Sequence, residues 1–392
     1  MTPPHPEGLR EQLARLDPVL RKHLDSAGFD AARLERLAAS LRAKAEGKAA
    51  EGEARRDERN RVTGEVRPPD SDEILVAPRR GSPESAHLAT KGEAAMARGE
   101  LAFCVLAGGM ATRMGGVVKA LVEATPGKTF LDLRLAENRS VCERTGTTVP
   151  LWLMTSEATD GPIRAALKAA GAPSHVRTFT QDLSLRLAHD GGLFYGEDGE
   201  PSVYATGHGD LPDAVRRSGL LRSFRQSGGR FVWIANLDNL GATIDPMILG
   251  AFITSNKEVL VEVCDKAEGD RGGIPVHAHG RLQVLEEFRL PRTFDAAKVR
   301  VFNTNTFLVR ADALENADIA WSWFEVEKKV GGGAAIQFER LLQELTGALP
   351  SAYLRVPREG KESRFLPVKD NEELARRRGD IEAVMRSRGL LL

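Results

Sequence analysis

Cysteine is scarce in this chain, and long apolar runs are missing. The three cysteines, Cys104, Cys142 and Cys264, show no metal-like spacing, so neither a cysteine metal site nor a disulfide framework is expected. No apolar run approaches the roughly 18 residues of a membrane span, and the first residues lack the apolar segment of a secretory signal. We expect a cytoplasmic protein without a membrane partner.

A net charge is missing as well. Lysine plus arginine and aspartate plus glutamate number 55 each, which gives a formal net charge of zero. Proteins that live on nucleic acid usually carry a basic excess, so nucleic acid is not an expected partner. Hydrophobic residues (42%) and charged residues (28%) have the proportions of a globular protein. None of these numbers indicates an oligomeric state.

The 392 residues are too many for one ordinary core, and the pattern predicts three consecutive regions. Residues 1–96 form a helical N-terminal region with a charged linker, since leucines recur at helical spacing before a charged stretch at 44–74. Residues 97–325 form the main catalytic domain. Residues 326–392 form a small C-terminal α/β subdomain.

Short apolar runs alternate with helical patterns along the main domain, which predicts an α/β fold. The runs read as buried strands and lie at 101–107, 150–154, 231–237, 259–264 and 299–309. The helical patterns lie at 161–170, 210–226 and 245–255. The C-terminal region adds a helix at 334–346, a strand at 352–356 and a basic terminal helix. We expect a mostly parallel central sheet flanked by helices, with ligands at the carboxyl ends of its strands.

The strongest local feature is the glycine-rich loop LAGGMATRMGG at 106–116, directly after the first strand. Gly108 and Gly109 lack Cβ atoms, so their backbone N–H groups can approach a nucleotide closely. Arg113 offers a planar donor fork for phosphate oxygens, and Lys119 adds a compact positive charge.

Other interpretations of this loop are less favourable. A glycine pair after a strand can be a plain turn. The spacing is not the G-x-G-x-x-G of a dinucleotide fingerprint. The PGKT at 126–129 is not a P-loop, because Val122 stands where its first glycine would be. The remaining pattern resembles the signature loop of sugar-nucleotide pyrophosphorylases.

Eight further segments, in the same order, resemble the UTP–glucose-1-phosphate uridylyltransferase family. With the loop they cover about 101 to 370, roughly two thirds of the chain. The segments are TFLDL (129–133), LWLMTSEATDGPI (151–163), TFTQDLSLRL (178–187), GHGDLPDAVRRSGLL (207–221), FVWIANLDNLGATIDPMIL (231–249), VEVCDKAEGDRGG (261–273), FNTNTF (302–307) and RFLPVK (364–369).

The resemblance implies a Rossmann-like, GT-A-like nucleotidyltransferase that uses UTP, a sugar 1-phosphate and Mg²⁺. The catalytic residues it implies are Arg113, Lys119 and Lys369. The nucleotide-binding residues it implies are Leu106, Ala107, Gly108, Gly109, Gln181, Gly207, Asn236 and Asp238, with Asp238 also as the metal ligand. The residues it implies for the sugar phosphate are His208, Arg271, Gly273, Asn303 and Asn305.

The chemistry explains why cations and a carboxylate are expected here. A sugar 1-phosphate oxygen attacks the α-phosphate of UTP in line and releases pyrophosphate. This nucleophile is already an anion, so the protein must position two polyanions and offset their charge. Asp238 ends the strand at 231–237, where one carboxylate suffices to anchor Mg²⁺. The alternative for Asp238 is an Asx-turn cap.

Strand alternation supports the polar pairs. Asn236 and Asp238 face one way, as do Asn303 and Asn305, whose amides could bind sugar hydroxyls. Asparagines satisfied within the core are the alternative for the second pair. For His208, which lies between two glycines, a purely structural role is the alternative.

Two departures from the family pattern bear on function. Val118 replaces the usual proline before Lys119, and Arg271 stands where the family has lysine; each segment is one residue shorter. A uridylyltransferase for N-acetylhexosamine 1-phosphate or galactose 1-phosphate is therefore an alternative, as is a catalytically silent nucleotide-binding regulator. Retention of Arg113, Lys119, Asp238 and Lys369 together favours the enzyme.

Overall fold

The computed structural model describes residues 8–45, 60–111 and 114–391. The chain forms two compact units, each built from separate segments. Unit 1 comprises Met1–Val62, Gln181–Ala214 and Trp321–Leu342. Unit 2 comprises Thr63–Thr180, Val215–Ala320 and Gln343–Leu392. This partition is not the series of three consecutive regions predicted from the sequence, because segments far apart in the chain pack together in both units.

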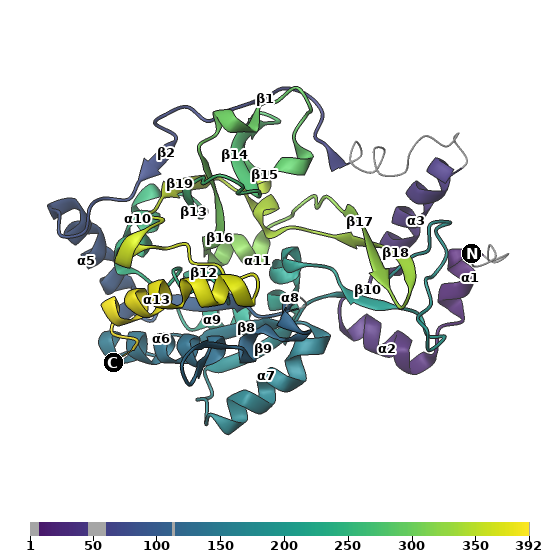
Figure 1. The fold of residues 1–392 in the computed structure, drawn as a ribbon, viewed down its shortest axis with the longest axis horizontal. Coiled ribbons are helices and arrows are strands. Elements are labelled where there is room, and N and C mark those ends of the chain that lie inside the picture. Colours follow the sequence, from purple (N-terminus) through teal and green to yellow (C-terminus); the bar gives the residue numbers. More distant parts are fainter. Residues whose placement is uncertain (1–7, 46–59, 112–113, 392) are drawn as a thin grey trace. The chain divides into compact units, whose positions relative to one another are not determined.

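An eight-stranded sheet forms the centre of unit 2 (Figure 1). In spatial order its strands are β2 (Ile74–Val76), β19 (Ser351–Arg355), β13 (Val259–Asp265), β16 (Val301–Arg310), β12 (Phe231–Asn236), β3 (Leu101–Leu106), β8 (Leu151–Thr155) and β9 (Val176–Thr180). All neighbours pair in parallel except β16, which is antiparallel to β12 and β13. The predicted mostly parallel α/β sheet is confirmed, with the run at 299–309 as its antiparallel member.

Helices flank this sheet, and several begin at recognisable caps. The longer helices of unit 2 are α5 (Pro83–Ala97), α6 (Phe130–Thr145), α7 (Glu157–Ala169), α10 (Pro246–Ser255) and α13 (Asn371–Ser387). Thr129 and Asp132 form a capping box at the start of α6, and the Asp245 carboxylate caps α10. The predicted helices at 161–170 and 245–255 are thus confirmed.

A smaller sheet of unit 2 joins β1 (Val66–Arg67), β14 (Gly273–Ala278) and β15 (Arg281–Glu286) in antiparallel order. The connection between β14 and β15 is the pair His279–Gly280, and both residues have positive φ. Two positive φ values in a two-residue loop are the requirement of a tight hairpin turn.

Unit 1 contains the predicted N-terminal helices, α1 (Leu9–Ala14), α2 (Pro18–Ser26) and α3 (Ala31–Ala45). Their leucines share one buried core with β10 (Leu183–Leu185) and β18 (Gly333–Glu339). Leu13, Leu24 and Leu34 belong to this core together with Leu185 and Phe338. The amphipathic pattern therefore predicted the helices correctly, but their packing partners come from distant segments.

Two predicted helices are wrong in detail. The segment at 334–346 begins as β18, which pairs antiparallel with β17 (Phe324–Val330). Gly331 and Gly332 have positive φ and close that hairpin, so pairing overrides the helix propensity of the residues that follow. The helix at 210–226 is divided into α8 (Leu211–Arg217) and α9 (Leu220–Gln226), because Gly219 is left-handed.

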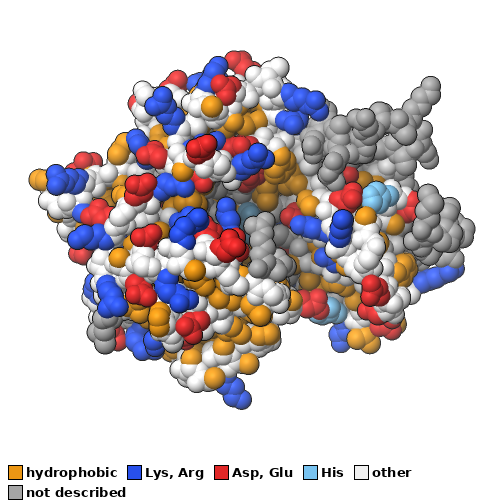
Figure 2. Space-filling model, viewed as in Figure 1, with side chains coloured by type: hydrophobic (Ala, Val, Ile, Leu, Met, Phe, Trp, Pro, Cys, Tyr) orange, Lys and Arg blue, Asp and Glu red, His pale blue; other side chains and the backbone are white. Residues whose placement is uncertain are grey.

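Within the described residues, no helix is both long and apolar enough to cross a membrane. Figure 2 shows basic and acidic side chains interspersed over the face in view, in keeping with the balanced composition.

Two glycines allow α5 and α10 to cross at very short range. A Cβ atom at Gly92 would overlap the carbonyl oxygen of Pro246, and one at Gly250 would overlap that of Leu88. Each helix therefore presents a bare backbone to the other. Both glycines lie within helices, where the backbone conformation does not call for glycine, so close packing is the reason for glycine at both positions.

We predict that Gly250→Ala destabilises the protein. The gain in helix propensity, up to about 1 kcal/mol, is smaller than the roughly 1–3 kcal/mol cost of overpacking. Gly379→Ala is the matched control, since Gly379 lies in α13 with open space around it. Thermal unfolding should show a lower Tm for the first variant and an equal or higher Tm for the second. A Tm for Gly250→Ala at or above that of the parent would contradict the prediction.

Candidate active site

The glycine loop leaves the sheet at the end of β3 and returns as a small hairpin of β4 (Met110–Ala111) and β5 (Val117–Val118). Arg113 lies outside the described residues, so its predicted role stays a prediction. At the start of the loop, Ala107 donates its N–H to Met154 (2.8 Å) and accepts from the Thr159 hydroxyl (3.1 Å). A Cβ atom at Gly109 would meet none of the described residues within 4 Å. This backbone is anchored at its base and open beyond it.

Lys119 and Asp238 form an ion pair, with 2.5 Å between Nζ and Oδ2. Their side chains are 18% and 17% exposed, so the pair is largely desolvated yet accessible. The backbone N–H of Lys119 also contacts the Gly109 carbonyl at 3.3 Å. These contacts bring together the glycine loop, the predicted lysine and the predicted carboxylate. In the sequence, Asp238 lies more than a hundred residues beyond the loop and Lys119.

The two predicted asparagine positions also meet. Asn305 donates from Nδ2 to Oδ1 of Asn236 at 2.7 Å, and its N–H contacts Oδ1 of Asn303 at 2.8 Å. The register between β13 and β16 shifts between Glu262 and Val263, so the simple alternation expected for β16 is interrupted here. Asn305 has a φ of 57°, a left-handed conformation that is uncommon outside glycine. Such strain is often kept at functional sites.

Arg134 holds the loop that follows β12, a role that sequence reasoning missed. It is fully buried, and its guanidinium donates to the carbonyls of Asn236 (2.8 Å) and Asn239 (2.7 Å). Glu137, one turn further along α6, balances its charge at 2.7 Å. An arginine and a glutamate three residues apart in a helix have an ordinary surface pattern, so the sequence carries no sign of burial.

The C-terminal segment RFLPVK is docked on the same loop. Asn239 donates to the carbonyl of Arg364 (3.1 Å) and accepts from the N–H of Leu366 (2.8 Å). Gly241 is a requirement of this docking, because a Cβ atom there would lie 2.7 Å from the Arg364 carbonyl carbon. The buried Arg364 guanidinium contacts both carboxylate oxygens of Glu262, at 2.7 and 2.6 Å.

Lys369 follows this docked segment and is exposed. Its N–H contacts Oε2 of Glu373 at 2.8 Å. Burial opposes the charge of Asp270, but the hydrogen bond from Arg358, with a smaller contribution from Lys369, outweighs it and lowers the pKa of Asp270. Within the described residues no hydrogen bond or ion pair joins Lys369 to Lys119 or Asp238, so its contact with phosphate stays a prediction.

On the predicted sugar side, Gly273 is buried at the start of β14 and Arg271 is exposed just before it. A Cβ atom at Gly273 would overlap Cγ1 of Val284 at 2.6 Å, and it would lie 3.4 Å from Oε1 of Glu286 and 3.7 Å from Cβ of Asn303. Glu286, which was not predicted, accepts from the Gln343 amide at 2.5 Å, and burial raises its pKa. The structure thus places Gly273, Asn303 and Glu286 side by side. Among the residues that the structure describes, no hydrogen bond or ion pair joins Arg271 to this group.

The remaining predicted residues, Gln181, Gly207 and His208, belong to unit 1. Gln181 is buried. Gly207 has a φ of 103°, and a Cβ atom there would lie 2.8 Å from the Arg340 carbonyl oxygen. His208 accepts from the Leu342 N–H at Nδ1 (3.0 Å), and burial lowers the pKa of its imidazole to about 4. Near neutral pH it therefore offers an Nε2–H donor and no positive charge.

A buried arginine organises this part of unit 1. Arg340 contacts Asp210 at 2.7 Å, Asp182 at 2.7 Å and Asp213 at 2.5 Å. Burial opposes the arginine charge, but these three carboxylates outweigh it and raise its pKa. The Asp210 carboxylate also accepts from the Thr206 hydroxyl and the Asp182 N–H, so it serves this cluster. The cluster stabilises the turn that carries Gly207 and His208.

Comparison with known proteins finds a matching family model and similar curated proteins. The family model "UTP--glucose-1-phosphate uridylyltransferase" matches residues 57–386. The chain is 33% identical to a UTP--glucose-1-phosphate uridylyltransferase of Musa acuminata, over 70% of this chain and 62% of that protein. It is 33% identical to that of Solanum tuberosum, over 70% of this chain and 60% of that protein. The match thus spans about three fifths of the length of these curated relatives.

Solved structures share the fold. The uridine diphosphate N-acetylglucosamine pyrophosphorylase of Trypanosoma brucei gives a TM-score of 0.70 at 20% identity, over 95% of this chain and 85% of that one. The UDP-glucose phosphorylase of Trypanosoma brucei gives 0.69 at 22% identity, over 91% and 77%. The family model covers most of the sequence, and the fold agrees with it. The chain therefore belongs to the UTP–glucose-1-phosphate uridylyltransferase family.

Proposed function

We propose that this protein is a uridylyltransferase that makes UDP-glucose and pyrophosphate from UTP and glucose 1-phosphate. The observation that carries the proposal is the Lys119–Asp238 pair beside the open backbone of Gly109. A cation, a carboxylate and the uncrowded backbone of Gly109 at one sheet edge suit the binding of phosphates rather than hydride transfer or hydrolysis by a triad. The three free cysteines support the proposed cytoplasmic setting.

The residues act by positioning and by offsetting charge. The attacking oxygen of a sugar 1-phosphate is an anion, so no general base is needed. Lys119, held in place by Asp238 and by the Gly109 carbonyl, would stabilise negative charge that develops at the α-phosphate. Arg134 and Asn239 keep the loop that carries Asp238 rigid, which preserves this geometry without touching substrate.

Magnesium fits this site on the chemistry of its donors. Lys119 contacts one oxygen of the Asp238 carboxylate, and Mg²⁺ takes one or two protein carboxylates together with phosphate and water oxygens. Asp238 would therefore hold the ion. When bound, Mg²⁺ supplies charge neutralisation for the phosphates.

The choice of sugar rests on the group formed by Gly273, Asn303 and Glu286. An amide and a partly buried carboxyl group can bind the hydroxyls of a hexose. N-acetylhexosamine 1-phosphate and galactose 1-phosphate are the alternative substrates, and a silent regulator is the alternative to an enzyme. Pyrophosphate release from UTP with a panel of sugar 1-phosphates distinguishes them. A regulator would bind UTP and release none.

We predict that Asp238→Asn lowers turnover by orders of magnitude while the protein stays folded. The amide keeps the size of the side chain but loses the charge that pairs with Lys119 and would anchor the metal. Steady-state kinetics over a range of Mg²⁺ concentrations, beside thermal unfolding, make the measurement. Unchanged turnover with unchanged magnesium dependence would refute the role of Asp238.

We predict that Gln181→Ala raises the KM for UTP more than it lowers kcat. The resemblance assigns this glutamine to the uracil base, whose binding is largely the same in ground and transition states. Kinetics with UTP as the varied substrate check the split. A lower kcat at unchanged nucleotide affinity would contradict base recognition by Gln181.

We predict that Lys369→Ala lowers kcat/KM. The decrease should correspond to a loss of about 2–4 kcal/mol of transition-state stabilisation, the usual effect of losing one preorganised donor. Its exposure means that folding stability should hardly change. Lys257→Ala is the matched control, because it removes an exposed lysine from the same unit. Equal kinetics for both variants would show that Lys369 does not reach the phosphates.

A further inference from the structure

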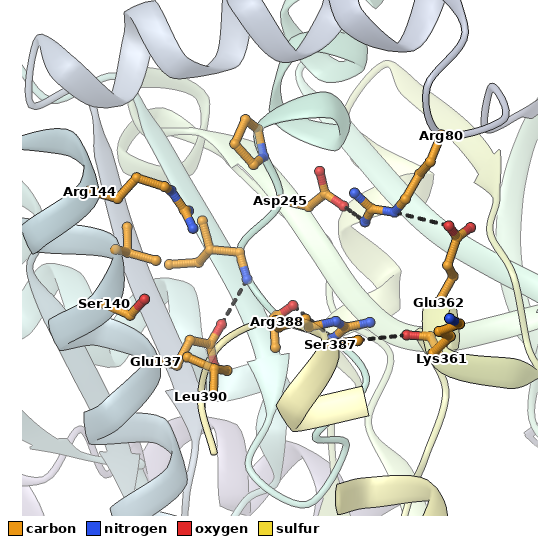
Figure 3. Close-up of a pocket in the computed structure, with 14 residues that line it drawn as sticks. Arg80, Glu137, Ser140, Arg144, Asp245, Lys361, Glu362, Ser387, Arg388 and Leu390 are labelled. Carbon is orange, nitrogen blue, oxygen red and sulfur yellow. Dashed lines mark hydrogen bonds and ion pairs between the residues drawn. The ribbon is translucent and has the colours of Figure 1, made fainter. Parts of the chain in front are cut away.

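A cavity of about 650 Å³ lies in unit 2, and none of the proposed active-site residues lines it (Figure 3). Its walls come from the second half of α6, the segment 243–246, the short helix η7 (Gly360–Glu362) and the end of α13. Cavities of this size accommodate small organic ligands. The function proposed above leaves it without a role.

Four basic side chains line this cavity, and the three acidic ones are already engaged. Glu137 accepts from Arg134 and from the N–H of Ile244, each at 2.7 Å. Asp245 pairs with Arg80 and caps α10 through the N–H of Met247. Glu362 lies 3.9 Å from Arg80. The negative charges of these three carboxylates are therefore offset by groups already in contact with or close to them.

Arg388 carries a positive charge, and none of the described carboxylates contacts its guanidinium to balance it. It donates at 2.7 Å to the carbonyls of Gly241 and Ser363 and to the hydroxyl of Thr243, all uncharged acceptors. Burial, and then the neighbouring Arg364, lower the pKa of its guanidinium to about 9. Arg388 thus remains a cation near neutral pH. Because its guanidinium is partly desolvated, it attracts an anion more strongly than an exposed arginine would.

Arg144 and Lys361 add two more cations at the rim. Figure 3 shows Arg144 extending from α6 into the cavity, across from Lys361. Both are exposed, and neither forms an ion pair with any residue in the described part of the chain. Three positive groups on three different elements therefore line one cavity, with Arg388 between Arg144 and Lys361.

Helix ends alone do not explain this arrangement. Arg144 lies in the last turn of α6, and Arg388 follows the last turn of α13, where basic residues complement the carbonyl end of a helix. That effect accounts for each arginine separately. It does not account for Lys361, because the helix η7 that carries it has only three residues and so little dipole. Nor does it account for the cavity between the three cations.

We propose that this cavity binds a phosphorylated small molecule whose phosphate contacts Arg388, while Arg144 and Lys361 attract it from opposite sides of the cavity. Arginine forks suit phosphate oxygens, and lysine adds a point charge. The rest of the ligand occupies the space beside Val141 and Ile244. Because Arg388 contacts Gly241 and Thr243, the occupant lies against the loop that continues from Asp238. The proposal concerns binding alone and is independent of the reaction proposed above.

Calorimetric titration of the full chain with inorganic phosphate and with glucose 6-phosphate tests the site, at constant ionic strength. The double variant Arg144→Gln/Lys361→Gln should bind both probes at least tenfold more weakly than the parent. The control Lys168→Gln/Arg222→Gln removes the same charge from exposed positions that do not line the cavity, and it should bind as the parent does. Both probes should also raise the Tm of the parent and not that of the double variant.

A third variant, Lys119→Gln, separates this cavity from the candidate active site. It should retain the binding that Arg144→Gln/Lys361→Gln loses. The proposal is overturned if the parent binds neither probe, if the charge-matched control loses binding equally, or if Lys119→Gln alone abolishes it. Should the double variant fail to unfold cooperatively, the single exposed substitution Arg144→Gln takes its place, and unchanged affinity there also overturns the proposal.

Discussion

The parallel pairing of β3 with β12 is the constraint on which the candidate active site depends. Their register runs from Leu101 opposite Phe231 to Leu106 opposite Asn236, so both strands end at the same level. Two loops that are distant in sequence therefore leave the sheet side by side. This is what allows Lys119 to reach Asp238. Since side chains alternate along a strand, a slip of one residue would turn Asn236 to the opposite face.

Buried arginines fix the loop after β12 from two sides. Arg134 reaches it from α6, and Arg364 reaches Thr243 from the C-terminal segment. Burying such charges is costly, and an ion pair alone seldom repays the cost. Here each guanidinium also donates to backbone carbonyls that would otherwise be buried without partners. We interpret both as positioning residues. Their burial lowers the folding stability somewhat, but it holds the loop in a single conformation.

The same loop connects the two proposed ligand sites of unit 2. Its first residues carry Asp238, while Gly241 and Thr243 contact Arg388 at the second cavity. Asn305 contributes strain nearby, with its left-handed backbone held by hydrogen bonds to the side-chain oxygens of Asn236 and Asn303. Rigidity at this edge is thus produced by polar contacts between segments, whereas the apolar strands behind it supply the platform.

The sequence by itself determined the platform: apolar runs marked β3 and β12, glycines marked the loop, and a terminal carboxylate marked Asp238. These signals are local, because burial and turn geometry act on consecutive residues. Only the tertiary structure decided that 333–339 is a strand, that β16 is bulged at Asn305, and that Arg134 and Glu286 belong to the site. Each of these depends on a partner far along the chain, and a contact between distant residues leaves no periodic pattern in either segment.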